Sequence, residues 1–238
     1  MIKNKNIALG LILGSGVDLS DDIITEKNVI FEETKGVHHK LIYECKIAGA
    51  DVLVFKGRKH FYEGYTSEEI TSNIKTAKEL GVKNLLITNA AGGLNENFCE
   101  GDFMLITSHI DFIDKLPKLP SANTYSKVLQ EKFRAACRKA QVRLQEGTYG
   151  CYSGPTYETK AEIRFQKKIG LDAAGMSTVP EVNNANHYGI NVIGVSIITN
   201  ILKENSISVA THEDVLITAG LASKNLNNVI PAFISELN

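Results

Sequence analysis

Short apolar runs alternate with helix-like segments along the chain, and this alternation limits the possible folds more than any other feature of the sequence. The runs are residues 7–13, 41–45, 51–55, 85–88, 103–107, 147–152 and 192–199. Runs of this length predict buried strands, and their alternation with helices predicts an α/β fold around a largely buried sheet. Neither an internal repeat nor a Pro/Gly-rich linker divides the sequence, so we predict a single domain over residues 1–238.

The segments between these runs carry signals of helix starts and ends. Residues 66–69 (TSEE) form a capping box, and Gly81 provides the stop of that helix. Apolar residues recur at helical spacing over residues 129–140, which predicts an amphipathic helix. Thr178 and Thr211 are predicted to cap two further helices.

Composition excludes several classes of protein. The 238 residues are 43% hydrophobic and 22% charged, which is typical of a globular chain. The formal net charge is -1, from 26 basic and 27 acidic residues, and gives no basic excess to neutralise a phosphate backbone. We therefore expect no nucleic-acid partner.

The first residues resemble the start of a signal peptide, with a basic segment followed by an apolar one. We interpret residues 7–13 as a buried strand because this run is short, lacks an A-x-A cleavage site and leads directly into Gly14-Ser15-Gly16. No run approaches the ~20 apolar residues of a membrane span, so no membrane partner is expected. Four cysteines without a C-x-x-C pair exclude the usual zinc spacings and fit a reducing, cytoplasmic location.

Two strand-end segments have the chemistry of an anion site. Gly14-Ser15-Gly16 follows the first run, but Leu19 occupies the third glycine position of a dinucleotide fingerprint, which leaves a plain turn or a small anion nest. Arg58 and His60 are two apart after the run at 51–55, so on extended chain they face the same side, and Tyr62 continues that face. A guanidinium and an imidazole suit a phosphate, although a solvated basic turn is the alternative interpretation.

Further strand-end segments bring small and polar residues. They are residues 88–95, residues 153–159 with Glu158 ahead of a helix, residues 175–181 at a strand-to-helix junction, and Thr199-Asn200 at the end of the longest run. Each also has a structural interpretation: a turn, a helix cap, or a carboxylate that favours the helix dipole. Strand-end loops are where open α/β sheets bind ligands, so their combination predicts a binding site.

These segments, in this order, resemble the low-molecular-mass, typically homotrimeric purine nucleoside phosphorylases nearly end to end. The most specific stretches are residues 57–64 (GRKHFYEG), 88–94 (TNAAGGL), 175–182 (GMSTVPEV) and Thr199-Asn200. The resemblance implies a three-layer α/β/α fold with a mixed, partly barrel-like sheet. It also implies a homotrimer that needs neither metal nor organic cofactor, with inorganic phosphate as co-substrate.

The resemblance also implies the role of each site residue. Phosphate is expected to meet Ser15, His38, Arg58, His60, the Ala90 amide and Ser177; ribose is expected to meet Tyr62, Met176 and His212; the base is expected to meet Ala91, Gly92, Tyr157, Glu158 and Asn200. Catalysis is assigned to Asn200, Glu158 and His60. His39 competes with His38, and Tyr157 stands where the family more often has phenylalanine.

The reaction implied is reversible phosphorolysis of a purine ribonucleoside to free base and ribose 1-phosphate, a pentosyl transfer. Glu158 with Asn200 favours inosine and guanosine, because adenine N1 is an acceptor that would face a carboxylate. A methylthioadenosine-type phosphorylase is the nearest alternative, and Asn200 counts against it because that family has aspartate there. A non-catalytic purine or phosphate binding protein of the same fold is a second alternative. A nucleoside hydrolase is the third, but the aspartate-rich calcium site typical of that class is missing from the sequence.

The chain departs from the family in two places. Residues 112–125 form a shorter bridge than the family loop that lends an aromatic residue to the neighbouring subunit, and the usual helix before the first strand is missing. We therefore expect a more open site and a reduced trimer interface. Phe112 and Tyr125 are the candidates to replace the missing aromatic.

Overall fold

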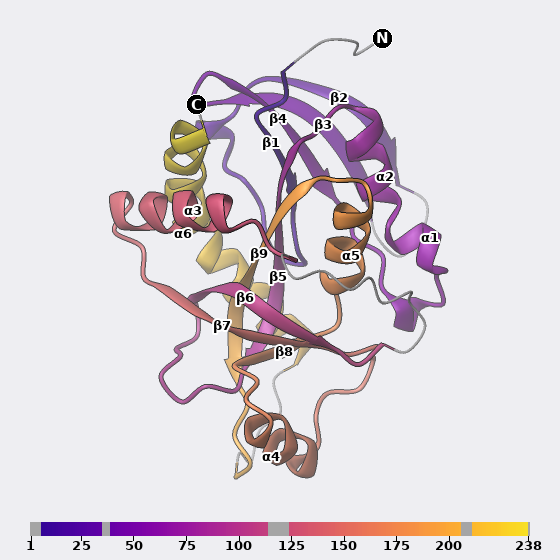
Figure 1. The fold of residues 1–238 in the computed structure, drawn as a ribbon, viewed down its shortest axis with the longest axis vertical. Coiled ribbons are helices and arrows are strands. Elements are labelled where there is room, and N and C mark those ends of the chain that lie inside the picture. Colours follow the sequence, from indigo (N-terminus) through magenta and orange to yellow (C-terminus); the bar gives the residue numbers. More distant parts are fainter. Residues whose placement is uncertain (1–5, 35–38, 114–123, 206–210, 238) are drawn as a thin grey trace.

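A computed structural model describes residues 6–34, 39–113, 124–205 and 211–237 of the protein (Figure 1). The strands are β1 (Leu9–Ile12), β2 (Thr25–Glu33), β3 (Lys40–Ile47), β4 (Ala50–Lys56), β5 (Asn84–Gly93), β6 (Phe103–Asp111), β7 (Leu144–Cys151), β8 (Ala173–Gly175) and β9 (Asn191–Ile201). The helices are α1 (Ser67–Ile70), α2 (Ser72–Glu79), α3 (Lys127–Lys139), α4 (Lys160–Lys168), α5 (Val179–His187) and α6 (His212–Leu237). Short 3-10 turns lie at Asp21–Ile23 and Phe61–Glu63.

The strands form one mixed sheet, part of which closes on itself. Its order is β2-β3-β4-β1-β5-β8-β7-β6-β9, and β9 also pairs in parallel with β5. This second pairing closes β5, β8, β7, β6 and β9 into a barrel, while β2, β3, β4 and β1 extend from it as an open sheet. The mixed, partly barrel-like sheet predicted above is confirmed.

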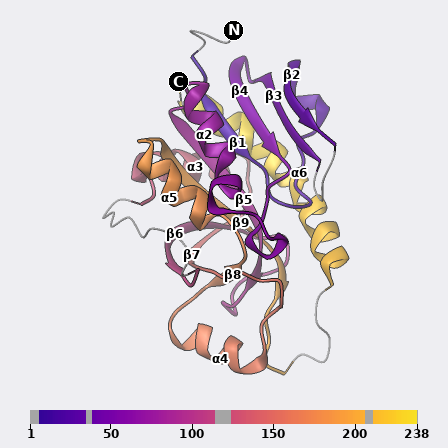
Figure 2. The same cartoon turned by 90° about the vertical axis from the view of Figure 1, so that its right-hand side faces the viewer.

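Helices cover both faces of this sheet (Figures 1 and 2). On one face, α3 and α6 bury an apolar cluster against the sheet that includes Phe133 and Phe233. On the other face, α2 and α5 pack through residues such as Ile74 and Val182. The three-layer arrangement follows from strands that are apolar on both sides, because each side needs a helical cover.

The predicted helix signals are correct at most positions. Thr66 caps α1 through a capping box with Glu69, and Thr211 accepts the backbone N–H of Asp214 at the start of α6. Thr178 is the exception. It occupies the N-cap position of α5, but its φ is 80° and its hydroxyl accepts from Asn89 Nδ2 at 2.7 Å instead of from a helix amide. Among the described residues, no helix is both long and apolar enough to cross a membrane.

Candidate active site

A cavity of about 440 Å³ lies at the carboxyl ends of the parallel strands β1, β4, β5 and β9. The predicted site residues that line it are Ser15, Arg58, His60, Tyr62, Ala90, Ala91, Gly92, Tyr157, Glu158, Met176, Ser177 and Asn200. His38 lies outside the described residues, and the side chain of His212 is not among those described. The predicted segments, far apart in sequence, therefore meet in one place, as strand ends do in α/β sheets.

Glycine makes the close approach of two loops possible. Gly57, which follows β4, has φ of 80°, and a Cβ there would lie 2.3 Å from the carbonyl oxygen of His39. Gly14 follows β1 and donates its backbone N–H to Thr88 Oγ1 at 3.0 Å. The lack of a side chain at Gly57 and the hydrogen bond of Gly14 let these two loops lie close to their neighbours, and Ser15 and Arg58, the residues that follow, line the cavity.

Arg58 is the main positive charge at this end of the cavity. Its side chain is 3% exposed, and its Nε lies 2.8 Å from Glu181 Oε2 in an ion pair. Its Nη1 donates to Ser177 Oγ at 3.3 Å. Because that hydroxyl accepts from Arg58, its own proton remains to donate to an anion.

His60 and Tyr62 form the adjoining wall. Their rings stack with centroids 5.0 Å apart. Glu63 Oε2 accepts the His60 backbone N–H at 3.1 Å, and Oε1 lies 3.4 Å from His60 Nδ1. The extended chain predicted for this stretch is wrong at Tyr62, because this contact closes residues Phe61–Glu63 into a 3-10 turn. The three side chains at positions 58, 60 and 62 nevertheless line the same cavity.

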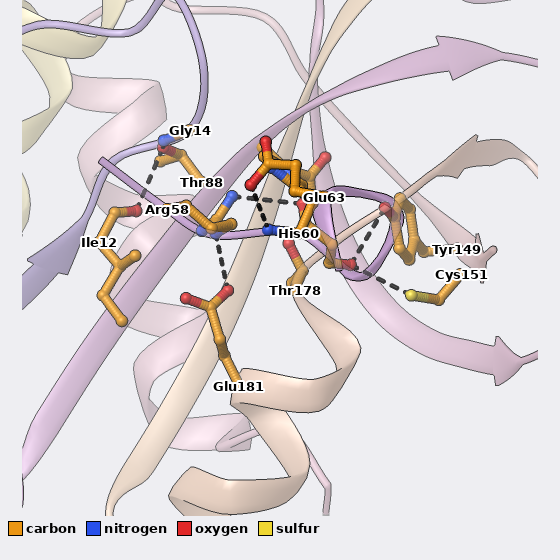
Figure 3. Close-up of polar contacts among 12 residues, drawn as sticks. Ile12, Gly14, Arg58, His60, Glu63, Thr88, Tyr149, Cys151, Thr178 and Glu181 are labelled. Atoms are coloured by element: carbon orange, nitrogen blue, oxygen red, sulfur yellow. Dashed lines mark hydrogen bonds and ion pairs between the residues drawn. The ribbon is translucent and has the colours of Figure 1, made fainter. Parts of the chain in front are cut away.

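Two side chains from β7 hold the turn between β8 and α5 in place. Tyr149 Oη and Cys151 Sγ both donate to the carbonyl oxygen of Ser177, each at 3.3 Å (Figure 3). Burial raises the pKa of both groups well above their ordinary values, so they remain protonated donors. They fix the Ser177 peptide and with it the hydroxyl that faces the cavity.

Asn200, near the end of β9, also lines the cavity. The register of β5 with β9 shifts between Ala91 and Gly92, and such irregularities commonly re-aim a side chain. The Thr199 hydroxyl lies 3.2 Å from Asn200 Oδ1 and 3.3 Å from the carbonyl oxygen of Ala91, and its one proton is donated to either of them. Asn200 lines the cavity, so its amide offers a bound molecule both a donor, Nδ2, and an acceptor, Oδ1.

Glu158 faces Asn200's end of the cavity from the start of α4. The N-cap of α4 is Thr159, so Glu158 precedes the helix and is not one of its first-turn charges. Burial raises the pKa of Glu158, and the Glu162 carboxylate raises it further, while its own backbone amide and the Gln166 side chain lower it. A half-buried acid with a perturbed pKa in a cleft is typical of a functional site.

Three polar residues near the cavity had no predicted role: Glu63, Glu181 and Thr199. Glu63 and Thr199 line it, while Glu181 lies behind Arg58. Glu63 follows His60 by three residues, a spacing that allows a contact within one turn. Glu181 carries no such signal, because its partner Arg58 lies in the loop after β4, far away in the sequence. The described residues contain no group of three or more His, Cys, Asp or Glu placed to hold a metal.

The two candidates for the missing aromatic residue, Phe112 and Tyr125, lie in different environments. Tyr125 is buried, and its hydroxyl lies 2.8 Å from His109 Nδ1, so it belongs to the core and does not extend toward another subunit. Phe112 is partly exposed and stacks on Tyr152 with ring centroids 4.5 Å apart. The expectation is therefore wrong for Tyr125 and stays a prediction for Phe112.

The family model and the relatives that match this sequence are all phosphorylases. Residues 8–235 match the model of the phosphorylase superfamily. Purine nucleoside phosphorylase 1 of Bacillus subtilis is 35% identical over 248 residues, which cover 96% of this chain and 92% of the relative. Purine nucleoside phosphorylase of Bos taurus is 38% identical over 208 residues, covering 79% and 72%.

Solved structures agree with this. Schistosoma purine nucleoside phosphorylase in complex with hypoxanthine has a TM-score of 0.89 at 32% identity, over 98% of this chain and 91% of that one. The Schistosoma mansoni enzyme in complex with adenosine has a TM-score of 0.88 at 31% identity, with the same coverage. With the cavity and its strand-end residues, these matches show that the chain belongs to the purine nucleoside phosphorylases of the phosphorylase superfamily.

Proposed function

We propose that the protein catalyses reversible phosphorolysis of purine ribonucleosides, with inosine and guanosine preferred. The products are the free base and ribose 1-phosphate, and the reaction needs no metal or organic cofactor because phosphate itself is the nucleophile. One observation carries the proposal. A single cavity is lined both by Arg58 and Ser177, which suit an anion, and by Glu158 and Asn200, which suit the edge of a purine, so one site offers groups for both substrates.

Phosphate binds at the Arg58 end. The guanidinium, the Ser177 hydroxyl, Ser15 and the Ala90 amide donate to its oxygens, and His60 completes the site. As the bond from ribose C1' to purine N9 breaks, its electron pair leaves with the base and the sugar becomes cationic. A phosphate oxygen held beneath C1' stabilises that charge and forms the new C–O bond. Tyr62 and Met176, which line the cavity, enclose the ribose. The family resemblance assigns His212 to the 5'-hydroxyl.

The base carries the negative charge that the breaking bond releases. Asn200 lines the cavity, and its Nδ2 donates to purine N7. Glu158 accepts the N1 hydrogen of hypoxanthine or guanine, and Tyr157, Ala91 and Gly92 line the pocket around the ring. Fixed donors aimed at a developing anion act as an oxyanion hole does.

The same contacts set the substrate. Adenine N1 is an unprotonated acceptor, so it would leave an ionised Glu158 unpaired, at a cost of about 1 to 3 kcal/mol. Asn200 also argues against a methylthioadenosine-type enzyme, in which a carboxylate would accept from the 6-amino group. Solved complexes of the Schistosoma enzymes include hypoxanthine, guanosine and adenosine, so members of this family accommodate several purines.

We further propose that the protein acts as a homotrimer in the cytoplasm. The trimer is supported by the family resemblance. All four cysteines are free, and three are buried, as suits a reducing compartment.

The test is base release from inosine, guanosine and adenosine, each with and without inorganic phosphate. We expect release from inosine and guanosine that depends on phosphate, and much slower release from adenosine. Phosphate-independent release would indicate a hydrolase instead. Binding of purine and phosphate without any base release would indicate a non-catalytic binding protein.

A further inference from the structure

A buried carboxylate that the mechanism above does not use lies behind the phosphate end of the cavity. Glu181, in the first turn of α5, is 1% exposed at its side chain and forms the ion pair with Arg58 at 2.8 Å. Figure 3 shows it extending from α5 toward the guanidinium. It is not among the residues that line the cavity, so it acts on a bound anion without touching it, through Arg58 and through its own charge.

The local backbone holds Glu181 in this position under strain. Thr178, three residues before it, has a positive φ of 80°, which is costly for a β-branched residue. The Asn89 side chain secures that conformation by donating to the Thr178 hydroxyl at 2.7 Å. The Thr178 backbone amide in turn interacts with the Glu181 carboxylate and lowers its pKa. Contacts with Asn89 and with Glu181 both hold Thr178 in a strained conformation, and this turn places the Glu181 carboxylate beside Arg58. Strain of this kind is typical of functional sites.

Glu181 and Ser177 together define how Arg58 is presented. They come from the same turn and engage different nitrogens of the guanidinium, Nε and Nη1. The contact at Nε is an ion pair without hydrogen-bond geometry, and Nη2 likewise makes no hydrogen bond within the part of the chain that the structure describes. An arginine side chain has many rotamers, and contacts at two of its nitrogens fix both the position and the plane of the fork.

The pair also has an electrostatic consequence. Arg58 is permanently charged and buried, so without Glu181 it would need another counter-ion. Burial raises the pKa of Glu181, but the adjacent guanidinium opposes this shift and favours the carboxylate. An ionised Glu181 repels a phosphate on the other side of Arg58, and this repulsion is strong because the surroundings exclude water.

We propose that Glu181 is a positioning residue that serves as the resident counter-ion of Arg58, fixing the guanidinium and at the same time weakening the site for phosphate. The inference rests on the proposed function, in which Arg58 binds phosphate. The Arg58–Glu181 pair carries no net charge when Glu181 is ionised, so it attracts phosphate and ribose 1-phosphate less strongly than an unpaired guanidinium would and releases them more readily.

The test is the phosphate affinity of Glu181→Gln, measured on the full chain by isothermal titration calorimetry with inorganic phosphate. Glutamine keeps the shape and an acceptor for Nε but removes the charge. We expect the Kd and the KM for phosphate to fall about tenfold, because one repulsive charge near the anion is gone. The KM for inosine should stay unchanged. A purely structural role would lower stability without tightening phosphate.

Glu44→Gln is the matched control, because Glu44 is a buried glutamate on β3 that does not line the cavity. It should leave the phosphate Kd unchanged. A Glu181→Gln protein that binds phosphate no more tightly than wild type overturns the inference, while wild-type phosphate binding and phosphorolysis keep the proposed function. Wild-type protein that binds no phosphate overturns both.

If Glu181→Gln is unstable without phosphate, its melting temperature during a phosphate titration gives a second measurement. Phosphate then supplies the missing counter-ion, so its stabilising effect should exceed that on wild type and on Glu44→Gln. An effect equal to or smaller than that on wild type overturns the inference, as does failure to fold even in phosphate buffer.

Discussion

In the proposed mechanism, departure of the base depends most directly on Asn200. Replacing it by alanine removes the donor to N7 and leaves the phosphate end of the cavity intact. We expect turnover of inosine by Asn200→Ala to fall roughly 10²- to 10³-fold with phosphate binding unchanged. Asn191→Ala, at the exposed start of the same strand, is the control and should keep full activity. Near-normal turnover of Asn200→Ala would remove Asn200 from the mechanism.

Glu158 should make substrate preference depend on pH. Its pKa is raised by burial, so it takes up a proton at a higher pH than an ordinary glutamate does. The protonated acid no longer accepts from N1 of hypoxanthine but can donate to N1 of adenine. As pH falls below neutrality, the ratio of kcat/KM for adenosine to that for inosine should therefore rise.

The control for this pH dependence is Glu158→Gln, because its amide does not titrate in this range. In this variant, the ratio of kcat/KM for adenosine to that for inosine should not change across the same pH series. A rise in the ratio that persists in Glu158→Gln would assign the effect to another group, such as His60 at the phosphate end.

Sequence reasoning succeeds for single residues when the signal is local or belongs to a motif. Arg58, His60 and Tyr62 alternate within one segment and do line the same cavity. The pairing of Arg58 with Glu181 could not be foreseen, because two charged residues far apart in sequence give no sign that the fold brings them within 2.8 Å. Thr178 failed as a cap for the same reason, since its partner Asn89 lies on another element.

At the scale of elements, the N-terminus of α4 links a capping box to the base site. Thr159 accepts the backbone N–H of Glu162, and Glu162 accepts that of Thr159, directly beside Glu158. Thr159→Ala should reduce the free energy of unfolding by about 1 kcal/mol. It should also raise the KM for inosine by about twofold to fivefold, because Glu158 loses its fixed neighbour.

Thr66→Ala removes the equivalent cap of α1, outside the cavity, and provides the control for Thr159→Ala. It should lower the melting temperature without changing the KM for inosine. If both variants change stability alone, the cap of α4 does not position Glu158.

The elements missed by sequence reasoning are those without an apolar pattern. Every predicted run corresponds to a strand, but β2 is exposed along nearly its whole length and β8 has only three residues. Both form because neighbouring strands offer unpaired backbone groups: β2 pairs with β3, and β8 bridges β5 and β7. Such strands depend on tertiary pairing, which the local sequence does not encode.

At the scale of the whole molecule, closure of the barrel by β5 and β9 brings Ala91 and Gly92 beside Asn200. Only the family resemblance implied this closure, since strand order is not visible in periodicity. The assembly follows from the same resemblance, and with Tyr125 buried the protein has fewer aromatic residues to offer a neighbour's site.

We expect a trimer in solution whose activity per subunit falls on dilution, because separation of the subunits would expose the ribose site to water. Mass measured by light scattering, together with activity over the same dilution series, checks this. A stable monomer with undiminished activity would contradict the trimer.

The most direct measurement of the central claim is the fate of phosphate itself. Inosine and inorganic phosphate are incubated with the protein and followed by phosphorus NMR, with hypoxanthine measured in parallel. We expect each hypoxanthine released to be matched by one phosphate converted to ribose 1-phosphate, and Arg58→Ala to need far more phosphate for the same rate. Hypoxanthine released together with free ribose, or no conversion of phosphate at all, would contradict it.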